Sequence, residues 1–174
     1  RRSFLKVSAA AGGGMALGFS WLASCTPIEQ AEAGLEMPEE WFQINGFLKI
    51  GENGVVTIMS PNPEIGQNVK TAMPMIVAEE LDVDWSNVIV EQAPLNTNAF
   101  QRQVAGGSQS IRRSWDGLRM AGATAKAMLL QAAAQKLEVP TMQLSASNGV
   151  ISHTNSDQTF TYGELASLAA TMEV

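Results

Sequence analysis

The chain has 174 residues, of which 45% are hydrophobic and 16% charged, as is usual for a globular protein with a real core. Its formal net charge of -6 argues against nucleic acid as a partner. The sequence begins with Arg1 and not with a methionine, and we therefore expect it to be part of a longer protein.

The first residues have the pattern of an export signal. Arg1 and Arg2 form a pair, Lys6 follows, and a mildly apolar run rich in Ala and Gly extends from Val7 to Ala23. The alternative is a transmembrane helix, but the glycines and serines make this run too short and too weakly apolar to span a bilayer. The pattern predicts a twin-arginine signal and a periplasmic protein. Because that route carries folded cargo, it also hints at a cofactor inserted in the cytoplasm.

Two cleavage sites are compatible with this signal. Residues 22–25 resemble a lipobox ending at Cys25, and residues 31–33 form a small-x-small site. Cys25 is therefore either a lipid anchor or part of a discarded peptide, and as the sole cysteine it forms no intrachain disulfide. Loss of residues 1–24, which hold three cations and no acid, would change the net charge from -6 to -9. We expect a signal and cleavage region at 1–33, a linker at 34–40 and a domain at 41–174.

The first half of this domain alternates strands and a helix. We expect strands at 44–50 and 55–60 around a turn at 51–54, a helix at 71–81 and a strand at 88–92. Thr71 is the expected N-cap of that helix, with Pro74 still in its first turn.

The strongest helical pattern runs from 108 to 137, after a polar loop at 93–107. Apolar and small residues recur there at spacings of four and three: Ile111, Trp115, Leu118, Gly122, Ala125, Leu129 and Ala132. A hairpin follows, with strands at 143–147 and 150–153, then a strand at 159–161 and a helix at 162–172. This order predicts an α+β fold, with a small mixed sheet packed against one long and two shorter helices.

Two glycine-containing loops, 63–68 and 105–110, each run directly into a predicted helix. Such loops can hold phosphate groups, because a helix N-terminus offers free N–H groups and partial positive charge. Arg112 and Arg113 near the start of the second helix would oppose its dipole, which favours an anion among them. The alternatives are ordinary loop geometry with Ser108 as an N-cap, and a solvated arginine face paired with acids such as Glu64 or Asp116.

These loops resemble those of a known family. Glu64-Ile65-Gly66-Gln67-Asn68, followed by Thr71, resembles the E-x-G-Q-G-x-x-T segment of the molybdenum hydroxylases, the xanthine dehydrogenase and aldehyde oxidase superfamily. Gly106-Gly107-Ser108-Gln109-Ser110 resembles their second pterin-contacting loop. With the twin-arginine start, the segment 78–85 and the Ser114-Trp115 pair, the chain is most similar to exported large subunits of the isoquinoline oxidoreductase type.

The resemblance implies a molybdopterin-binding domain that carries molybdenum, with the cofactor in its cytosine dinucleotide form. It implies cofactor-binding residues in both loops: Gly66, Gln67, Asn68, Gly106, Gly107, Ser108 and Ser110. Asn68 stands where the family usually has a second glycine, which puts close approach of the backbone to the ligand in doubt. Asparagine does tolerate the left-handed conformation better than most residues do.

The reaction implied is hydroxylation of an aldehyde or a nitrogen heteroaromatic ring with oxygen from water. The partners implied are a small iron-sulfur subunit and a cytochrome c electron acceptor. The family's catalytic glutamate lies in a Gly-x-Gly-Glu-like segment near the far end of the full subunit, and this sequence has no such segment. We therefore expect no catalytic residue here. A non-enzymatic exported lipoprotein that binds a small anion or a partner protein is the competing hypothesis.

Other reactive residues are expected to be structural. Glu79 and Glu80 are adjacent on a predicted helix, so they cannot face one site and should lie on its solvent side. His153, the single histidine, should be a surface residue and not a metal ligand. The methionines, among them Met73, Met75 and Met128, are expected in the core.

Overall fold

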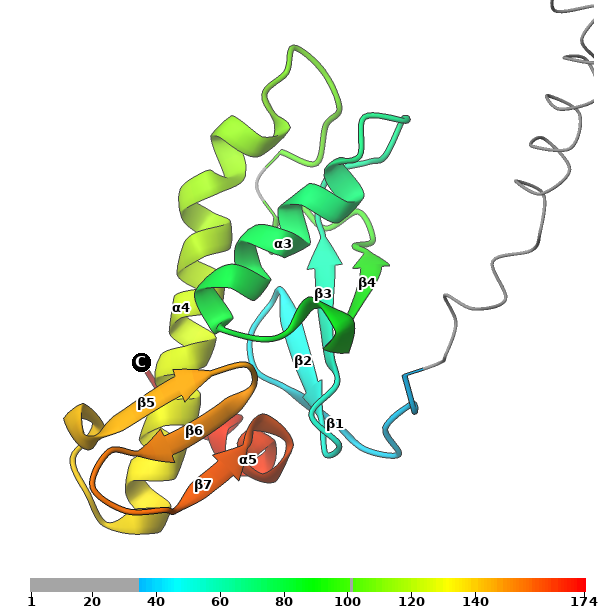
Figure 1. The fold of residues 1–174 in the computed structure, drawn as a ribbon. Helices are drawn as coiled ribbons and strands as arrows, with labels where there is room; N and C mark the ends of the chain where they lie inside the picture. The colour runs from blue at the N-terminus through cyan, green and yellow to red at the C-terminus, as the bar shows by residue number, and fades with distance from the viewer. Residues whose placement is uncertain (1–34, 101) are drawn as a thin grey trace, which may run out of the picture. The chain divides into compact units, whose positions relative to one another are not determined.

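The computed structural model describes residues 35–100 and 102–174, shown in Figure 1. Residues 36–174 form one unit by their contacts. The predictions for the export signal at Arg1 and Arg2, for its cleavage sites and for lipidation at Cys25 lie outside the described residues.

The elements of this unit alternate between strands and helices in the first half. In chain order they are β1 (Trp41–Gln43), β2 (Leu48–Gly51), β3 (Val56–Ser60), α3 (Val69–Leu81), the 3-10 turn η1 (Trp85–Asn87), β4 (Val88–Gln92), α4 (Ser110–Leu137), the 3-10 turn η2 (Thr141–Gln143), β5 (Leu144–Ser147), β6 (Val150–His153), β7 (Thr159–Thr161) and α5 (Tyr162–Ala169). Each predicted helix and strand has a counterpart here, so the α+β class is confirmed.

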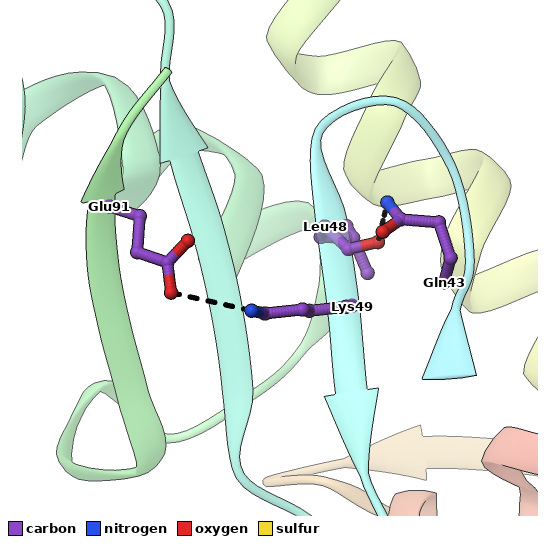
Figure 2. Close-up of polar contacts among 4 residues, drawn as sticks. All are labelled: Gln43, Leu48, Lys49 and Glu91. Atoms are coloured by element: carbon purple, nitrogen blue, oxygen red, sulfur yellow. Dashed lines mark hydrogen bonds and ion pairs between the residues drawn. The ribbon is translucent and has the colours of Figure 1, made fainter. Parts of the chain in front are cut away.

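The first sheet has the order β1-β2-β3-β4. β1, β2 and β3 are antiparallel neighbours, whereas β4 lies parallel to β3 because α3 carries the chain back between them. Lys49 on β2 reaches across β3 to Glu91 on β4, with 3.4 Å between Nζ and Oε1 (Figure 2). The carboxyl ends of β3 and β4 therefore lie side by side, and the two glycine loops follow in the chain after these strands.

The core lies between this sheet and the two longer helices (Figure 1). Alternate residues of β2 and β3 point into it, and α3 and α4 supply the opposite side. Its fully buried members include Leu48, Ile50, Val56, Ile58, Met73, Val77, Leu81, Leu118, Ala125 and Leu129. The predicted stripe on α4 is thus largely confirmed, but Trp115 is 45% exposed and does not belong to the core.

Helices α3 and α4 approach each other closely at Gly122, as expected from the small residues there. A β-carbon at this position would lie 2.5 Å from the Val77 carbonyl oxygen and 2.8 Å from Glu80 Cβ. A side chain larger than the hydrogen of glycine does not fit at this position, because the Val77 carbonyl oxygen belongs to the main chain and cannot rotate away.

The last three strands form a second, separate sheet of order β5-β6-β7, entirely antiparallel. This corrects the prediction of one small mixed sheet. The β5–β6 turn is bound instead to the end of α3, where Gly149 N donates to the Asp82 carbonyl oxygen over 2.8 Å. Helix α5 begins with a capping box formed by Thr161 and Glu164 and packs against α4.

The predicted strand 44–50 is wrong over its first half. β1 is an additional short strand before it, and the chain turns between β1 and β2. Asn45 closes this turn, since its Oδ1 accepts hydrogen bonds from Phe47 N at 2.9 Å and Leu48 N at 3.2 Å. Asparagine side chains commonly form such turns with the backbone two residues on.

Thr71, the predicted N-cap, is also wrong, and so is Ser108, the N-cap of the alternative. Helix α3 begins at Val69 with Asn68 as its N-cap, so Thr71 lies inside the helix and Pro74 is beyond the first turn. Helix α4 begins at Ser110 with Gln109 as its N-cap. Ser108 has φ 52° and belongs to the loop. Helix α5 ends at Ala169, short of Met172.

The segment 36–40 forms neither helix nor strand and lies against the β2–β3 hairpin. Glu39 N and Glu40 N donate to the Glu52 carboxylate over 2.7 and 2.8 Å. These two bonds help to hold the pKa of Glu52 below its ordinary value, although partial burial opposes them most strongly. Among the helices in the described part of the chain, none is both long enough and apolar enough to cross a membrane.

Candidate functional site

The two glycine loops meet at one pocket of about 420 Å³. Its lining comes from both loops and from the first residues of α3 and α4: Ile65, Gln67, Val69, Ala105, Gly106, Gly107, Ser108, Ser110 and Ile111. Five of the seven residues predicted to bind a cofactor therefore lie around one space, and its volume is within the range of small-molecule sites. Gly66 and Asn68 belong to the first loop without lining the pocket.

Glu64 organises the first loop from within. Its Oε1 accepts hydrogen bonds from Gly66 N at 2.6 Å and Asn68 N at 3.0 Å, and its Oε2 accepts one from Lys70 N at 3.0 Å. These backbone donors, Lys70 N–H foremost, hold the pKa of Glu64 below its ordinary value. A carboxylate thus already occupies the N-terminus of α3. The sequence marks Glu64 as part of the loop motif and, in the alternative, as a partner for the arginines, and neither predicts this bonding within the loop.

Gln67 is hydrogen-bonded inside its own loop. Its Oε1 accepts from Ile65 N at 2.6 Å, and its Nε2 donates to the Pro63 carbonyl oxygen at 3.0 Å. These two bonds leave one N–H and one oxygen lone pair of this amide for a ligand. The next residue, Asn68, has φ 62° and ψ 21°, the left-handed conformation that asparagine tolerates. The loop therefore keeps its turn without the family's usual glycine.

The second loop turns through two successive left-handed residues. Gly107 has φ 62° and Ser108 has φ 52°. Gly106 differs from them, because its φ is not positive and a β-carbon added there would meet no atom within 4 Å. The chain's own geometry does not require glycine at 106, which leaves room for a ligand to approach this backbone closely.

The N-terminus of α4 is open, in contrast to that of α3. The side chain of its N-cap residue, Gln109, accepts no hydrogen bond from a backbone N–H of the helix, and its first turn contains no acidic residue. Its first N–H groups, from Ser110 and Ile111, belong to residues that line the pocket. Of the two helix N-termini at this site, α4 is the one that can receive an anion.

The two arginines do not form the expected anion cluster. Arg112 and Arg113 are exposed and are not among the residues lining this pocket. Arg113 Nε instead donates to Gln109 Oε1 at 3.2 Å. Neither arginine pairs with a carboxylate of the described residues, so Glu64 and Asp116 are not their partners. The open end of α4, and not the arginines, is therefore the part of this pocket suited to an anion.

Sequence reasoning missed Asn62, which connects the two loops. This residue follows β3, is only 3% exposed, and donates from Nδ2 to the Val104 carbonyl oxygen at 2.9 Å and to Ser110 Oγ at 3.1 Å. Its Oδ1 has no partner among the described residues. No short-range pattern marks Asn62, because both of its acceptors lie more than 40 residues further along the chain.

The other reactive side chains have structural surroundings. Glu79 is exposed, and Glu80 pairs with Arg119, so these acids do not form one site. His153 bonds Ser156 Oγ through Nδ1 at 2.7 Å and Gln143 Oε1 through Nε2 at 3.2 Å. The described residues contain no group of three His, Cys, Asp or Glu that could hold a metal ion.

The methionine prediction holds only in part. Met73 and Met128 are buried in the core, whereas Met37, Met75, Met120 and Met142 are exposed.

The pocket offers donors and acceptors for a flat polar ring that carries an anion. Gln67 supplies an amide, and Ser108 and Ser110 supply hydroxyls. Ile65, Val69 and Ile111 supply apolar surface, and α4 supplies free N–H groups. This chemistry fits a pterin bearing a phosphate, which combines a ring rich in hydrogen-bonding groups with negative charge.

Comparison with known proteins agrees with this geometry. Residues 8–174 match the family described as "Molybdopterin cofactor-binding domain". Isoquinoline 1-oxidoreductase subunit beta of Brevundimonas diminuta is 40% identical over 127 residues, which cover 70% of this chain and 16% of that protein. The membrane-bound aldehyde dehydrogenase [pyrroloquinoline-quinone] of Gluconacetobacter polyoxogenes is 28% identical over 87% of this chain and 19% of its own length.

A solved structure has the same arrangement of elements. Reconstituted CO dehydrogenase from Oligotropha carboxidovorans superposes with a TM-score of 0.57 and 25% identity, over 68% of this chain and 15% of that chain. The present chain thus spans less than a fifth of each of these proteins. The family match covers nearly all of the chain, which therefore belongs to the molybdopterin cofactor-binding domain family of molybdenum hydroxylase large subunits.

Proposed function

We propose that the pocket between loops 63–68 and 105–110 holds part of a molybdopterin cofactor. The observation that carries the proposal is that these two loops, far apart in sequence, line one cavity beside the open N-terminus of α4. Family membership supports the kind of ligand, and the local geometry supports the place. A helix N-terminus without a cap is a suitable site for the phosphate of such a cofactor.

Each loop has a distinct part in this proposal. Ser108 and Ser110 would offer hydroxyls to the pterin and phosphate, while Gly106 and Gly107 would let the backbone come close. Gln67 would keep both bonds within its loop and offer its second N–H or its second oxygen lone pair to the ligand. Gly66 and Asn68 would act indirectly, by shaping the turn from which Gln67 extends.

We propose further that the whole protein is a molybdenum-dependent hydroxylase or dehydrogenase of an aldehyde or a nitrogen heteroaromatic compound. The names of two relatives, an isoquinoline oxidoreductase and an aldehyde dehydrogenase, support these substrate classes. When bound, the cofactor would supply the redox centre that transfers oxygen derived from water. The described residues would bind and orient it, and the catalytic glutamate would come from another part of the full subunit.

The proposed partners follow from this assignment. The relative named as a subunit beta is one part of an assembly, which supports a partner subunit for this protein too. We propose a small iron-sulfur subunit as that partner, a cytochrome c as electron acceptor, and the cytosine dinucleotide form of the cofactor. Purification of the full-length protein with its partner, followed by iron, molybdenum and nucleotide analysis, would test all three. Molybdenum without cytidine nucleotide would contradict the last.

We propose that the protein is exported by the twin-arginine route to the periplasm. The support is the pair Arg1 and Arg2 with the mildly apolar run behind it. A cofactor-binding protein suits a route that carries folded cargo. Cys25 remains a candidate for lipid attachment, which mass spectrometry of the mature N-terminus would decide: a first residue beyond Cys25 would contradict it.

A further inference from the structure

Asn62 lies at the junction of the two loops but outside the pocket that they line. We propose that Asn62 is a positioning residue, whose side chain fixes the second loop against the first so that the pocket has the shape needed for the cofactor. The inference rests on the proposed cofactor-binding function. It adds a residue to which neither the family resemblance nor the sequence motif assigns a role.

The first argument is the direction of its hydrogen bonds. Asn62 belongs to the segment that leaves β3 and leads into the first loop, yet both acceptors of its Nδ2 are on the second loop. Val104 immediately precedes the Ala105–Ser110 segment, and Ser110 is the first residue of α4. One amide thus holds the two ends of the second loop, over 2.9 and 3.1 Å.

The second argument is that Asn62 acts through Ser110. Ser110 lines the 420 Å³ pocket, whereas Asn62 lines only a separate cavity of about 10 Å³, which is room for a single water at most. Asn62 therefore does not contact a ligand in the pocket. It helps to place the Ser110 hydroxyl, which also donates to the Val104 carbonyl oxygen over 3.4 Å, and it occupies one of that hydroxyl's lone pairs.

The third argument is that the first loop has other anchors. Gln92 Nε2 donates to the carbonyl oxygens of Ser60 and Asn62 at 2.9 and 3.2 Å. Gln103 Nε2 donates to the Pro61 carbonyl oxygen at 3.0 Å. Because these bonds use the main chain of residues 60–62, they survive removal of the Asn62 side chain. Its loss should therefore loosen the second loop at Ser110 more than it loosens the first loop, while Gln103 still ties the residue before Val104 to Pro61.

The test compares Asn62→Ala with a matched control in the full-length protein. Asn45→Ala is the control, because Asn45 is also a partly buried asparagine that donates to a carbonyl oxygen of α4, that of Ala121 at 3.0 Å. Asn45 lies in the β1–β2 turn and lines none of the pockets near the glycine loops. Molybdenum per polypeptide, pterin fluorescence after acid release, and thermal unfolding are measured for both.

We expect Asn62→Ala to retain molybdenum and pterin about tenfold less well than wild type on prolonged dialysis, since two ordinary hydrogen bonds together amount to about that factor. Asn45→Ala should retain molybdenum and pterin fully, even if its unfolding temperature falls by as much as that of Asn62→Ala. Asn62→Ser, which keeps a small polar side chain too short to hold both acceptors, should fold if the alanine variant does not, and should lose molybdenum in the same way.

Two results would overturn the inference: full cofactor retention in either Asn62 variant, or equal losses in Asn62→Ala and Asn45→Ala, which would show a general effect of lower stability. Gly106→Val, measured in the same experiment, distinguishes an error in the role of Asn62 from an error in the proposed cofactor pocket. If Gly106→Val loses molybdenum while the Asn62 variants keep it, the pocket is right and the role of Asn62 is wrong. If all of them keep it, the pocket itself is wrong.

Discussion

The phenolic hydroxyl of Tyr162 donates to the carbonyl oxygen of Leu81 over 2.6 Å, joining the start of α5 to the end of α3. Both residues are fully buried. Tyr162→Phe would leave that carbonyl with an unmet hydrogen bond in the core, and we expect it to cost about 1 to 3 kcal/mol of unfolding free energy. Denaturant titration of the chain measures this, and an unchanged midpoint would contradict it.

The same tyrosine predicts a loss of stability in alkali. Burial, with a smaller contribution from the charge of Asp82, raises the pKa of Tyr162 above its ordinary value of 10.0. The folded state therefore holds the proton more tightly than the unfolded state does. The stabilisation that the protonated Tyr162 hydroxyl gives to the folded state is complete below pH 10 and is lost as the pH rises further. The unfolding free energy of Tyr162→Phe should fall less steeply above pH 10 than that of the wild type. An equally steep decline in both proteins would show that other groups cause it.

Gly122 and Gly117 offer a matched pair on helix α4. Alanine at 122 would place its β-carbon 2.5 Å from the Val77 carbonyl oxygen, so we expect a loss of about 1 to 3 kcal/mol from overpacking. Alanine at 117 would meet nothing within 4 Å and should add about 0.5 to 1 kcal/mol through helix propensity. A shift of the unfolding midpoint in the same direction for both variants would contradict this packing.

Glu64 predicts a stability change in acid. Its carboxylate accepts three backbone hydrogen bonds, which hold its pKa below the ordinary value of 4.5. The stabilisation is therefore fully present above pH 4.5 and is lost as the pH falls through the lower folded value. Glu64→Gln should be less stable than wild type at neutral pH, and the difference should shrink in acid. A difference of the same size in acid and at neutral pH would contradict this role of Glu64.

The export hypothesis can be tested by replacing Arg1 and Arg2 with lysine in the full-length protein. Because the translocase recognises the arginine pair, the variant should accumulate in the cytoplasm. Immunoblots of periplasmic and cytoplasmic fractions measure this, with Lys6→Arg as a charge-preserving control. Periplasmic yield equal to that of wild type would refute the assignment.

Periodic and turn-forming residues predicted most of the fold. Helix α4 was identified because its small and apolar residues recur at helical spacing from Ile111 to Ala132, about six turns. The β5–β6 hairpin was identified from Asn148 and Gly149, which both have positive φ. The separation of the two sheets was missed, because strand order depends on long-range contacts such as Gly149 N with the Asp82 carbonyl oxygen.

The candidate site was predictable only in part. The glycine loops were recognised from their motifs, and five of the seven residues named do surround one pocket. The sequence did not predict which of the two helix N-termini is free. That depends on the Glu64 carboxylate, which accepts hydrogen bonds from Asn68 N and Lys70 N at the start of α3. A glutamate four residues before the N-cap, Asn68, was the available signal. Asn62 gave none, since a buried asparagine bonded across 42 and 48 residues has no local signature.

The central claim is that the pocket between the loops receives a molybdopterin, and Gly106 tests it most directly. Gly107→Val would be ambiguous, because φ 62° strains any side chain there whether or not a ligand is near. Gly106 has no such constraint and open space around it, so valine at 106 should leave the folded chain intact. Gly46 has the same two properties in the β1–β2 turn, away from the loops, and is the matched control.

The decisive measurement is molybdenum per polypeptide in full-length wild type, Gly106→Val and Gly46→Val, each purified with its thermal unfolding recorded. The account predicts that Gly106→Val unfolds at the wild-type temperature but carries far less molybdenum, because the valine side chain occupies the space that the cofactor needs, while Gly46→Val keeps a full complement. Full molybdenum occupancy in Gly106→Val at unchanged thermal stability would contradict it.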